Sequence, residues 1–234
     1  MLQGHEHWKR VARKLSDICE GACYFFASFF MYASLFGVLF LMMQFLQIGL
    51  GYSPLSAGLR TLPWTGAPMI VAPIAGALAD RYGNRPFMIV GLALQAVGLG
   101  WIAAIAQPGM GYTQLAVALG VAGVGISLCF PTVANAIVGS VPPEDMGIAS
   151  GTNSSIREVG GVFGIAILAA VFANSGVYTS SAIFIDHFKH AVWAGAAFSA
   201  IGIIAAVALP RRTQVETAVE LPIHRTQIAV EPVA

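Results

Sequence analysis

The stretch Gly76-Ala77-Leu78-Ala79-Asp80-Arg81-Tyr82-Gly83-Asn84-Arg85-Pro86 joins two long runs of sequence that carry no charge. Residues 62–79 and residues 86–143 contain no Asp, Glu, Lys or Arg, and neither do residues 21–59. A helix needs about 20 apolar residues to cross a hydrocarbon core of about 30 Å, so runs of this length predict transmembrane helices. The charged stretch is therefore expected to form a short turn at a membrane surface between two spanning helices.

The composition of the whole chain supports a membrane protein. Of its 234 residues, 57% are hydrophobic and 10% are charged, whereas about 25% are charged in soluble domains. The formal net charge of +1 argues against nucleic-acid binding, which needs a basic face. We therefore predict an all-α integral membrane protein that contacts the lipid bilayer and no nucleic acid.

Six apolar segments predict a bundle of six transmembrane helices. Charged or turn-forming residues separate each segment from the next. A basic segment, residues 1–24, precedes the helical domain of residues 25–209, and a polar tail, residues 210–234, is predicted to be disordered. The predicted spans are residues 25–48, 61–79, 87–106, 114–138, 159–176 and 190–209.

The distribution of lysine and arginine predicts the orientation. If the N-terminus lies in the cytoplasm, ten of these residues, Arg157 among them, are inside, and Arg60 and Lys189 are outside. This arrangement obeys the positive-inside rule. An even number of spans then places both termini in the cytoplasm, and we expect a multi-pass protein of the plasma (inner) membrane.

The charged stretch has chemistry that can be read without reference to any family. Gly76 permits close approach of a neighbouring helix, and Asp80 is suited to meet a helix N-terminus or a cation. Gly83 permits a tight turn, and Arg81 and Arg85 place cations on the cytoplasmic side. The residues alone allow either a functional contact or a charged loop that only sets the topology.

The same stretch resembles the G-x-L-x-D-R-x-G-x-R loop of the major facilitator superfamily, which recurs between the second and third helices of each six-helix half. Residues 51–59 with 62–63, and residues 150–153 with 157–164, resemble the C-terminal half of its fourteen-span drug:proton antiporters. The resemblance covers about residues 25–210 and implies one half of a major facilitator fold. It implies a cytoplasmic latch formed by Gly76, Asp80, Arg81, Gly83 and Arg85.

The resemblance also implies proton-coupled efflux of drugs or other small amphipathic compounds by alternating access, with the proton gradient as the energy source and no cofactor. We expect the chain to act with an N-terminal half of six to eight helices, or with a partner chain, and not to pump alone. The alternatives are a non-transporting or degenerate half that pairs with another membrane protein, and a metabolite transporter of the same superfamily. No enzyme signature occurs, so neither enzymatic activity nor a catalytic residue is predicted.

Amide side chains inside the spans are candidates for a substrate pathway. An amide in hydrocarbon needs a partner, which either a cavity or a neighbouring helix can supply. Gln44 and Gln47 are three residues apart, so an α-helix places them on one face. The four candidates are Gln44, Gln47, Gln95 and Asn135.

The acidic residues are expected near the ends of the spans, which leaves no carboxylate for proton coupling deep in the membrane. These residues are Asp80, Glu144, Asp145, Glu158 and Asp186.

Prolines and glycines inside the spans are expected to serve helix packing or gating. They are Pro63, Pro68, Pro73, Gly120, Gly123, Gly125, Pro131, Gly160, Gly161 and Gly164.

No metal site is predicted. Cys19, Cys23 and Cys129 lack the spacing of zinc ligands, and His5 and His7 form a poor site in the N-terminal segment.

Overall fold

The computed structural model describes residues 2–139, 141–173 and 181–208, and it describes side chains from Ala22 onward except that of Ser181. Every regular element within these ranges is a helix. The predicted tail, residues 210–234, lies outside the described residues. The elements are α1 (Leu2–Gln44), the π-helix η1 (Phe45–Gly49), α2 (Pro54–Arg60), α3 (Leu62–Thr65), α4 (Ala67–Tyr82), α5 (Asn84–Ile105), α6 (Tyr112–Val138), the 3-10 helix η2 (Pro143–Asp145), α7 (Met146–Ala173) and α8 (Ser181–Val207).

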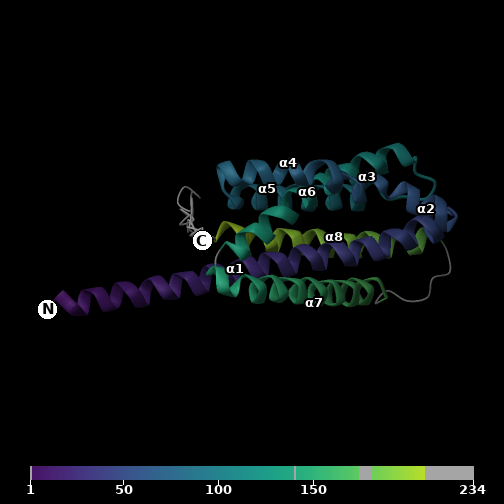
Figure 1. Ribbon diagram of the computed structural model, residues 1–234. Helices are drawn as coiled ribbons and strands as arrows, with labels where there is room; N and C mark the ends of the chain where they lie inside the picture. Colours follow the sequence, from purple (N-terminus) through teal and green to yellow (C-terminus); the bar gives the residue numbers. More distant parts are fainter. Residues whose placement is uncertain (1, 140, 174–180, 209–234) are drawn as a thin grey trace, which may run out of the picture.

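Six helical segments of the described chain are long and apolar enough to cross a membrane. This confirms the predicted all-α bundle of six membrane-spanning helices. Figure 1 shows the spanning helices running side by side, with the first part of α1 extending beyond the bundle. The segments are Ala22–Gly49, Leu62–Tyr82, Asn84–Ile105, Tyr112–Val138, Pro143–Ala173 and Ala182–Val207.

The bundle is held together by a few extensive helix pairs. α1 packs against α7 and α8, α5 packs against α6 and α8, and α4 packs against α6. The turn between α4 and α5 lies at the same end of the bundle as the last residue of α8, because Arg85 Nη2 donates a 2.5 Å hydrogen bond to the Val207 carbonyl. The apolar part of α1 begins at this end too (Figure 1). We call it the α4–α5 end.

Three helices begin well before the spans predicted for them, and the first of these, α1, begins at Leu2 instead of residue 25. α7 begins at Met146 instead of residue 159, and α8 begins at Ser181 instead of residue 190. Uncharged runs mark the residues suited to hydrocarbon, whereas a helix can also include polar residues at and beyond the membrane surface. Glu144 and Asp145 precede α7 in η2, where acidic side chains favour the start of a helix.

The second predicted span consists of short helices followed by α4. Pro63 and Pro68 stand in the first turns of α3 and α4, where the missing backbone N–H of proline costs no hydrogen bond. Only Pro73 lies inside a helix of this span. Two of the three prolines therefore start helices, and one interrupts the hydrogen bonding of a helix.

Arg60 connects the short helices to the rest of the bundle. Its guanidinium carbon lies 3.8 Å from the centre of the Tyr52 ring and 5.3 Å from that of Tyr112. The Tyr112 hydroxyl also donates a 3.0 Å hydrogen bond to the Arg60 carbonyl. These contacts tie α2 to the start of α6 at the end opposite the α4–α5 end.

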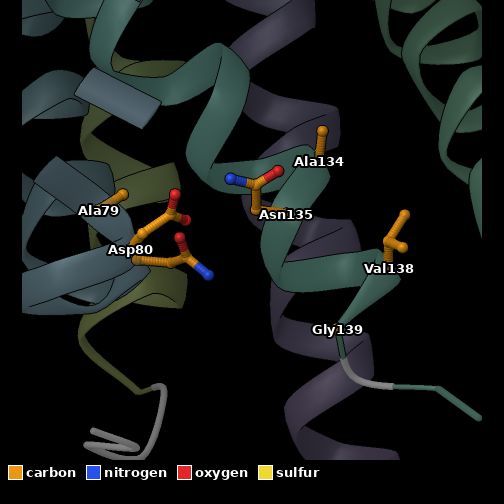
Figure 2. A pocket seen from close by; sticks show the side chains of 7 residues that line it. Ala79, Asp80, Ala134, Asn135, Val138 and Gly139 are labelled. Carbon is orange, nitrogen blue, oxygen red and sulfur yellow. The ribbon is translucent and has the colours of Figure 1, made fainter. Parts of the chain in front are cut away.

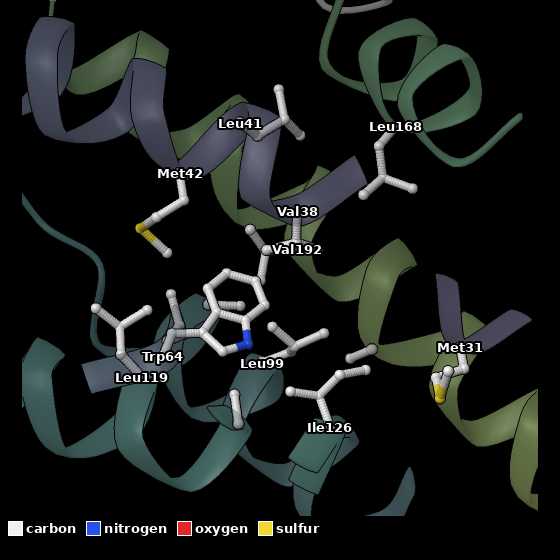
Figure 3. Close-up of a cluster of buried hydrophobic side chains, with 14 of the residues drawn as sticks. Met31, Val38, Leu41, Met42, Trp64, Leu99, Leu119, Ile126, Leu168 and Val192 are labelled. Carbon is white, nitrogen blue, oxygen red and sulfur yellow. The ribbon is translucent and has the colours of Figure 1, made fainter. Parts of the chain in front are cut away.

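The largest fully buried side chain among the described residues is that of Trp64 of α3, which is 1% exposed. Aliphatic side chains of several helices surround the indole ring, including Met42, Leu99 and Leu119 (Figure 3). A Cβ added to Gly123 of α6 would lie 2.8 Å from the Trp64 carbonyl oxygen. The glycine therefore permits the approach of α3 to α6 that buries the indole.

Candidate functional site

The turn between α4 and α5 has the tight geometry that the sequence predicted. α4 ends at Tyr82 and α5 begins at Asn84, so Gly83 alone separates the two helices. Gly83 has φ 84° and ψ 158°, a conformation that a residue with a Cβ rarely adopts. Its N–H donates a 2.8 Å hydrogen bond to the Ala79 carbonyl. The turn therefore fixes where the side chains on either side of Gly83 point.

Asp80 lies beside a pocket of about 450 Å³ between the α4–α5 turn and α6. The exposed Asp80 carboxylate and the exposed Asn135 amide face this space from opposite helices (Figure 2). The buried side chain of Asn84 adds a second amide. The structure thus brings together a residue of the expected latch and one of the expected pathway. The lining residues are Ala79, Asp80, Asn84, Ala134, Asn135, Val138 and Gly139.

The other residues of the expected latch have different surroundings. Arg81 is exposed, whereas Arg85 is half-buried and bonds to the end of α8. A Cβ added to Gly76 would lie 3.6 Å from Pro131 Cβ on α6, an ordinary van der Waals contact. The five residues therefore do not form one cluster: Asp80 borders the pocket, Gly76 lies against α6, and Arg85 holds α8.

Gln44 and Gln47 are both half-buried near the end of the bundle opposite the α4–α5 end. Gln44 is the last residue of α1, and Gln47 lies in the π-helix η1. The α-helical spacing that predicted a shared face does not apply across this junction, because a π-helix bonds residue i to residue i+5.

Gln95 is completely buried between α5 and α1. Its side chain is 0% exposed, and its Nε2 donates to the Met31 carbonyl at 3.4 Å. The placement favours helix-to-helix hydrogen bonding for this residue over the substrate-facing alternative.

The glycines expected to serve packing or gating lie mainly at close helix contacts. A Cβ on Gly160 would lie 2.8 Å from the Phe29 carbonyl oxygen, and a Cβ on Gly164 would lie 2.0 Å from that of Ala33. Gly125 similarly faces the backbone of Gln95 on α5. Gly120 is different, since no atom lies within 4 Å of its ideal Cβ.

A polar cluster lies in the middle of α7 and was not predicted from the sequence. Arg157 Nη2 lies 3.0 Å from Glu158 Oε1, and the Arg157 guanidinium carbon lies 5.9 Å from the centre of the Tyr32 ring on α1. One turn earlier, Ser28 Oγ donates a 3.1 Å hydrogen bond to Asn153 Oδ1. Glu158 lies in the middle of α7, because this helix begins at Met146.

One signal in the sequence would have revealed this placement. Pro142-Pro143-Glu144-Asp145 combines proline with two carboxylates, a pattern typical of a helix start. A helix that begins there and continues to the end of the apolar run contains Arg157 and Glu158 well inside it.

Neither of the cysteines with described side chains lines the pocket beside Asp80. Cys23 and Cys129 are free thiols, and no group of three metal-ligating side chains occurs among the described residues. Cys19, His5 and His7 lie where side chains are not described.

Comparison with known proteins identifies relatives of the chain. Multidrug resistance protein Stp of Mycobacterium tuberculosis is 36% identical over 140 residues, which are 60% of this chain and 26% of that protein. Multidrug efflux pump LfrA of Mycolicibacterium smegmatis is 35% identical over 197 residues, 80% of this chain and 37% of that protein. The Tetracenomycin C resistance and export protein of Streptomyces glaucescens is 34% identical over 142 residues, 60% of this chain and 26% of that protein.

The chain thus spans between about a quarter and just over a third of the length of these relatives. The sequence profile of the Major Facilitator Superfamily matches residues 24–230, which include the six spanning segments except Ala22 and Cys23. With its six-helix bundle and its charged turn between the second and third spans, the chain belongs to the Major Facilitator Superfamily.

Proposed function

We propose that this chain forms the C-terminal half of a transporter that exports drugs or other small amphipathic compounds. The observation that carries the proposal is membership of the Major Facilitator Superfamily together with similarity to proteins named for multidrug efflux, multidrug resistance and export. In such a transporter the substrate passes between two halves near the membrane midplane. These relatives favour drug export over both a non-transporting half and a metabolite transporter.

The least buried spans support a second half as partner. We compare the share of residues that is buried within an apolar 18-residue window of each span. This share is 17% for the span that contains α4 and 28% for that of α7, whereas it is 56% for the spans of α1 and α6. The uncovered face of α7 includes exposed Thr152, Ser155 and Glu158. Polar side chains on a spanning helix suit a protein partner or a water-filled pathway better than lipid tails. The proposed partner is an N-terminal half of six to eight helices.

The latch is proposed to act at the α4–α5 end. Asp80 is exposed beside the pocket, so its carboxylate is accessible to a helix N-terminus or a cation of the other half. Arg85 holds the end of α8 while the exposed Arg81 faces outward. Closure of the two halves at this end would then depend on Asp80 and Arg81, with Gly76, Gly83 and Arg85 positioning the turn.

The proposed orientation places the α4–α5 end in the cytoplasm. Arg81 and Arg85 lie at this end, and cations collect on the cytoplasmic side of membrane proteins. Both termini of the chain then lie in the cytoplasm. The membrane that the helices span is proposed to be the plasma (inner) membrane. The proposed energy source is the proton gradient, and no cofactor is required.

Transport can be tested in an efflux-deficient bacterium that makes this chain together with the N-terminal part of LfrA as a separate chain. We expect such cells to accumulate less ethidium than cells that make either chain alone. The difference should disappear when a protonophore collapses the proton gradient. Equal accumulation in all three strains, with both chains present in the membrane, would contradict the proposed function.

A further inference from the structure

α2 and the start of α3 present an uncovered apolar face at the end of the bundle opposite the α4–α5 end (Figure 1). Leu55, Leu59 and Leu62 are 76%, 58% and 54% exposed. They are spaced four and three residues apart, which places them on one side of a helix. Ala57, by contrast, is completely buried. The short helices therefore pack with one side against the bundle and leave the three leucines facing away from it.

The order of the spans places this leucine face at a membrane surface. The first spanning segment ends at Gly49 and the second begins at Leu62, so α2 lies between the ends of two spans. Tyr52 follows the first span by three residues, and Tyr112 is the first residue of the fourth span. Tyrosines at the ends of spans are typical of the headgroup level of a bilayer. Leucines that face outward from this level can reach the adjoining acyl chains.

Arg60 is a cation without a counter-ion at the same level. It is the only charged residue within residues 21–79, and among the described residues no Asp or Glu forms an ion pair with it. Its half-buried guanidinium lies over the Tyr52 ring and close to that of Tyr112. Aromatic rings offset part of the cost of burying a cation. An anion with acceptor oxygens is a stronger partner for a guanidinium.

The hydrogen bonds of the Arg60 guanidinium are incomplete as well. Nη1 donates to the carbonyl and the hydroxyl of Ser56. Nε is buried and has no acceptor within the described residues, and Nη2 makes no hydrogen bond to them either. A guanidinium has five N–H groups, so those on Nε and Nη2 are left for another partner. An arginine that only stabilised the C-terminal end of α2 would need no such partner.

We propose that α2 docks on the bilayer surface and that Arg60 binds the phosphate of a glycerophospholipid whose acyl chains cover Leu55, Leu59 and Leu62. The phosphate supplies the missing negative charge and the acceptor oxygens, for which a guanidinium is well suited. The neighbouring leucine face suits the acyl chains of a lipid, whereas a free phosphate ion would have no use for it. With the proposed orientation, the lipid belongs to the outer leaflet.

Native mass spectrometry of the purified full chain tests the proposal, because it counts the lipids bound to each protein. Dioctanoylphosphatidylglycerol carries a phosphate, and dioctanoylglycerol is the matched probe with the same acyl chains and no phosphate. We expect the chain to bind the phospholipid at least about fivefold more tightly. One arginine at the headgroup level favours an anionic lipid by about this factor.

Arg60→Gln should abolish the preference for the phospholipid, whereas Arg60→Lys should keep most of it because the charge remains. Lys189→Gln is the matched control, since it removes a cation from the half of α8 nearer to the same end of the bundle. This control should keep the full preference.

Leu55→Ser/Leu59→Ser tests the leucine face separately from the charge. The double variant should weaken the binding of both lipids by similar factors, because the leucines contact the acyl chains that the two lipids share. The preference for the phospholipid should remain. Unchanged affinity for both lipids would overturn the docking of α2 on the bilayer, even if Arg60→Gln folds poorly.

Equal affinities of the wild-type chain for the two lipids would overturn the proposal, and so would an unchanged preference in Arg60→Gln. Displacement of the phospholipid by an equal concentration of glycerol 3-phosphate would assign Arg60 to a free phosphate and not to a lipid. A dimer that persists with phospholipid present and is lost in Leu55→Ser/Leu59→Ser would assign the leucine face to a second copy of the chain. None of these measurements involves efflux, so the lipid site and the proposed function fail separately.

Discussion

Gly164 of α7 lies so close to Ala33 of α1 that an added Cβ would be 2.0 Å from the Ala33 carbonyl oxygen. Gly160, four residues earlier, makes the corresponding approach to Phe29. Small residues spaced by four allow two membrane helices to pack backbone against backbone. The same contact sets the position of Arg157 and Glu158 relative to Tyr32.

Replacing Gly164 with alanine should destabilise the bundle by about 1–3 kcal/mol, because the neighbouring atom belongs to the backbone and cannot move without displacing a helix. Gly120→Ala is the matched control. No atom lies within 4 Å of its ideal Cβ, so the better helix propensity of alanine should stabilise the fold by up to about 1 kcal/mol. Thermal unfolding of the two variants in detergent measures the difference in their stability. Equal melting temperatures would contradict the close packing at Gly164.

Two buried serine hydroxyls form a hydrogen-bonded chain between α1 and α8. Replacing each serine with alanine should lower the free energy of unfolding by unequal amounts. Ser199 Oγ donates to Ser34 Oγ at 2.9 Å, and Ser34 Oγ donates to the Gly195 carbonyl at 2.8 Å. Ser34→Ala removes both hydrogen bonds, whereas Ser199→Ala removes one. Hydrogen bonds between membrane helices contribute about 0.6 kcal/mol each, so Ser34→Ala should lower the free energy of unfolding about twice as much.

The double variant Ser34→Ala/Ser199→Ala tests whether the two hydroxyls act as one chain. It should be about as stable as Ser34→Ala alone, because neither hydrogen bond remains after the first change. Unfolding by a denaturing detergent would measure this, and strictly additive losses would argue against the chain.

Under the proposed function, Asp80→Asn should impair transport without lowering the amount of protein in the membrane. The change removes the charge beside the pocket and keeps the size of the side chain, so the effect should appear in ethidium efflux and not in folding. Asp186→Asn is the matched control, because Asp186 is exposed near the start of α8, at the other end of the bundle. Normal efflux by the Asp80 variant would remove the latch assignment.

The two glutamines near the end of α1 are predicted to contact substrate in the assembled transporter. The double variant Gln44→Ala/Gln47→Ala should then change the selectivity of efflux among dyes of different size, while the helix itself tolerates alanine. Efflux of several dyes, each compared with the wild type, measures this. Unchanged rates and selectivity would count decisively against a pathway role.

The number of spans followed directly from the uncharged runs, because only helices with few charges can cross the hydrocarbon core. The lengths of the helices did not follow from those runs. Met146–Glu158 and Ser181–Lys189 contain polar residues and were expected to be loops. A helix is specified by its backbone hydrogen bonds and its starting signals, whereas a hydropathy pattern reports only its surroundings.

The residues of the expected sites could be identified from sequence more readily than their neighbours in space. The break at Gly83 was predicted from the motif. Asp80 and Asn135 border the same pocket because α4 packs against α6. Arg157 lies over Tyr32 because α7 packs against α1. The two residues of each pair are far apart in sequence. The contact between Arg85 and the end of α8 likewise required the tertiary structure.

The π-helix η1 places one more residue in its turn than an α-helix of the same rise would hold. A relative that lacks a single residue between Phe45 and Gly49 would therefore keep a continuous α-helix and still deliver the following turn to the same place. In an alignment, such a one-residue gap would signify the loss of the widened turn beside Gln47 and not a shorter loop. Insertions and deletions at this point would thus reshape the helix without changing how the chain crosses the membrane.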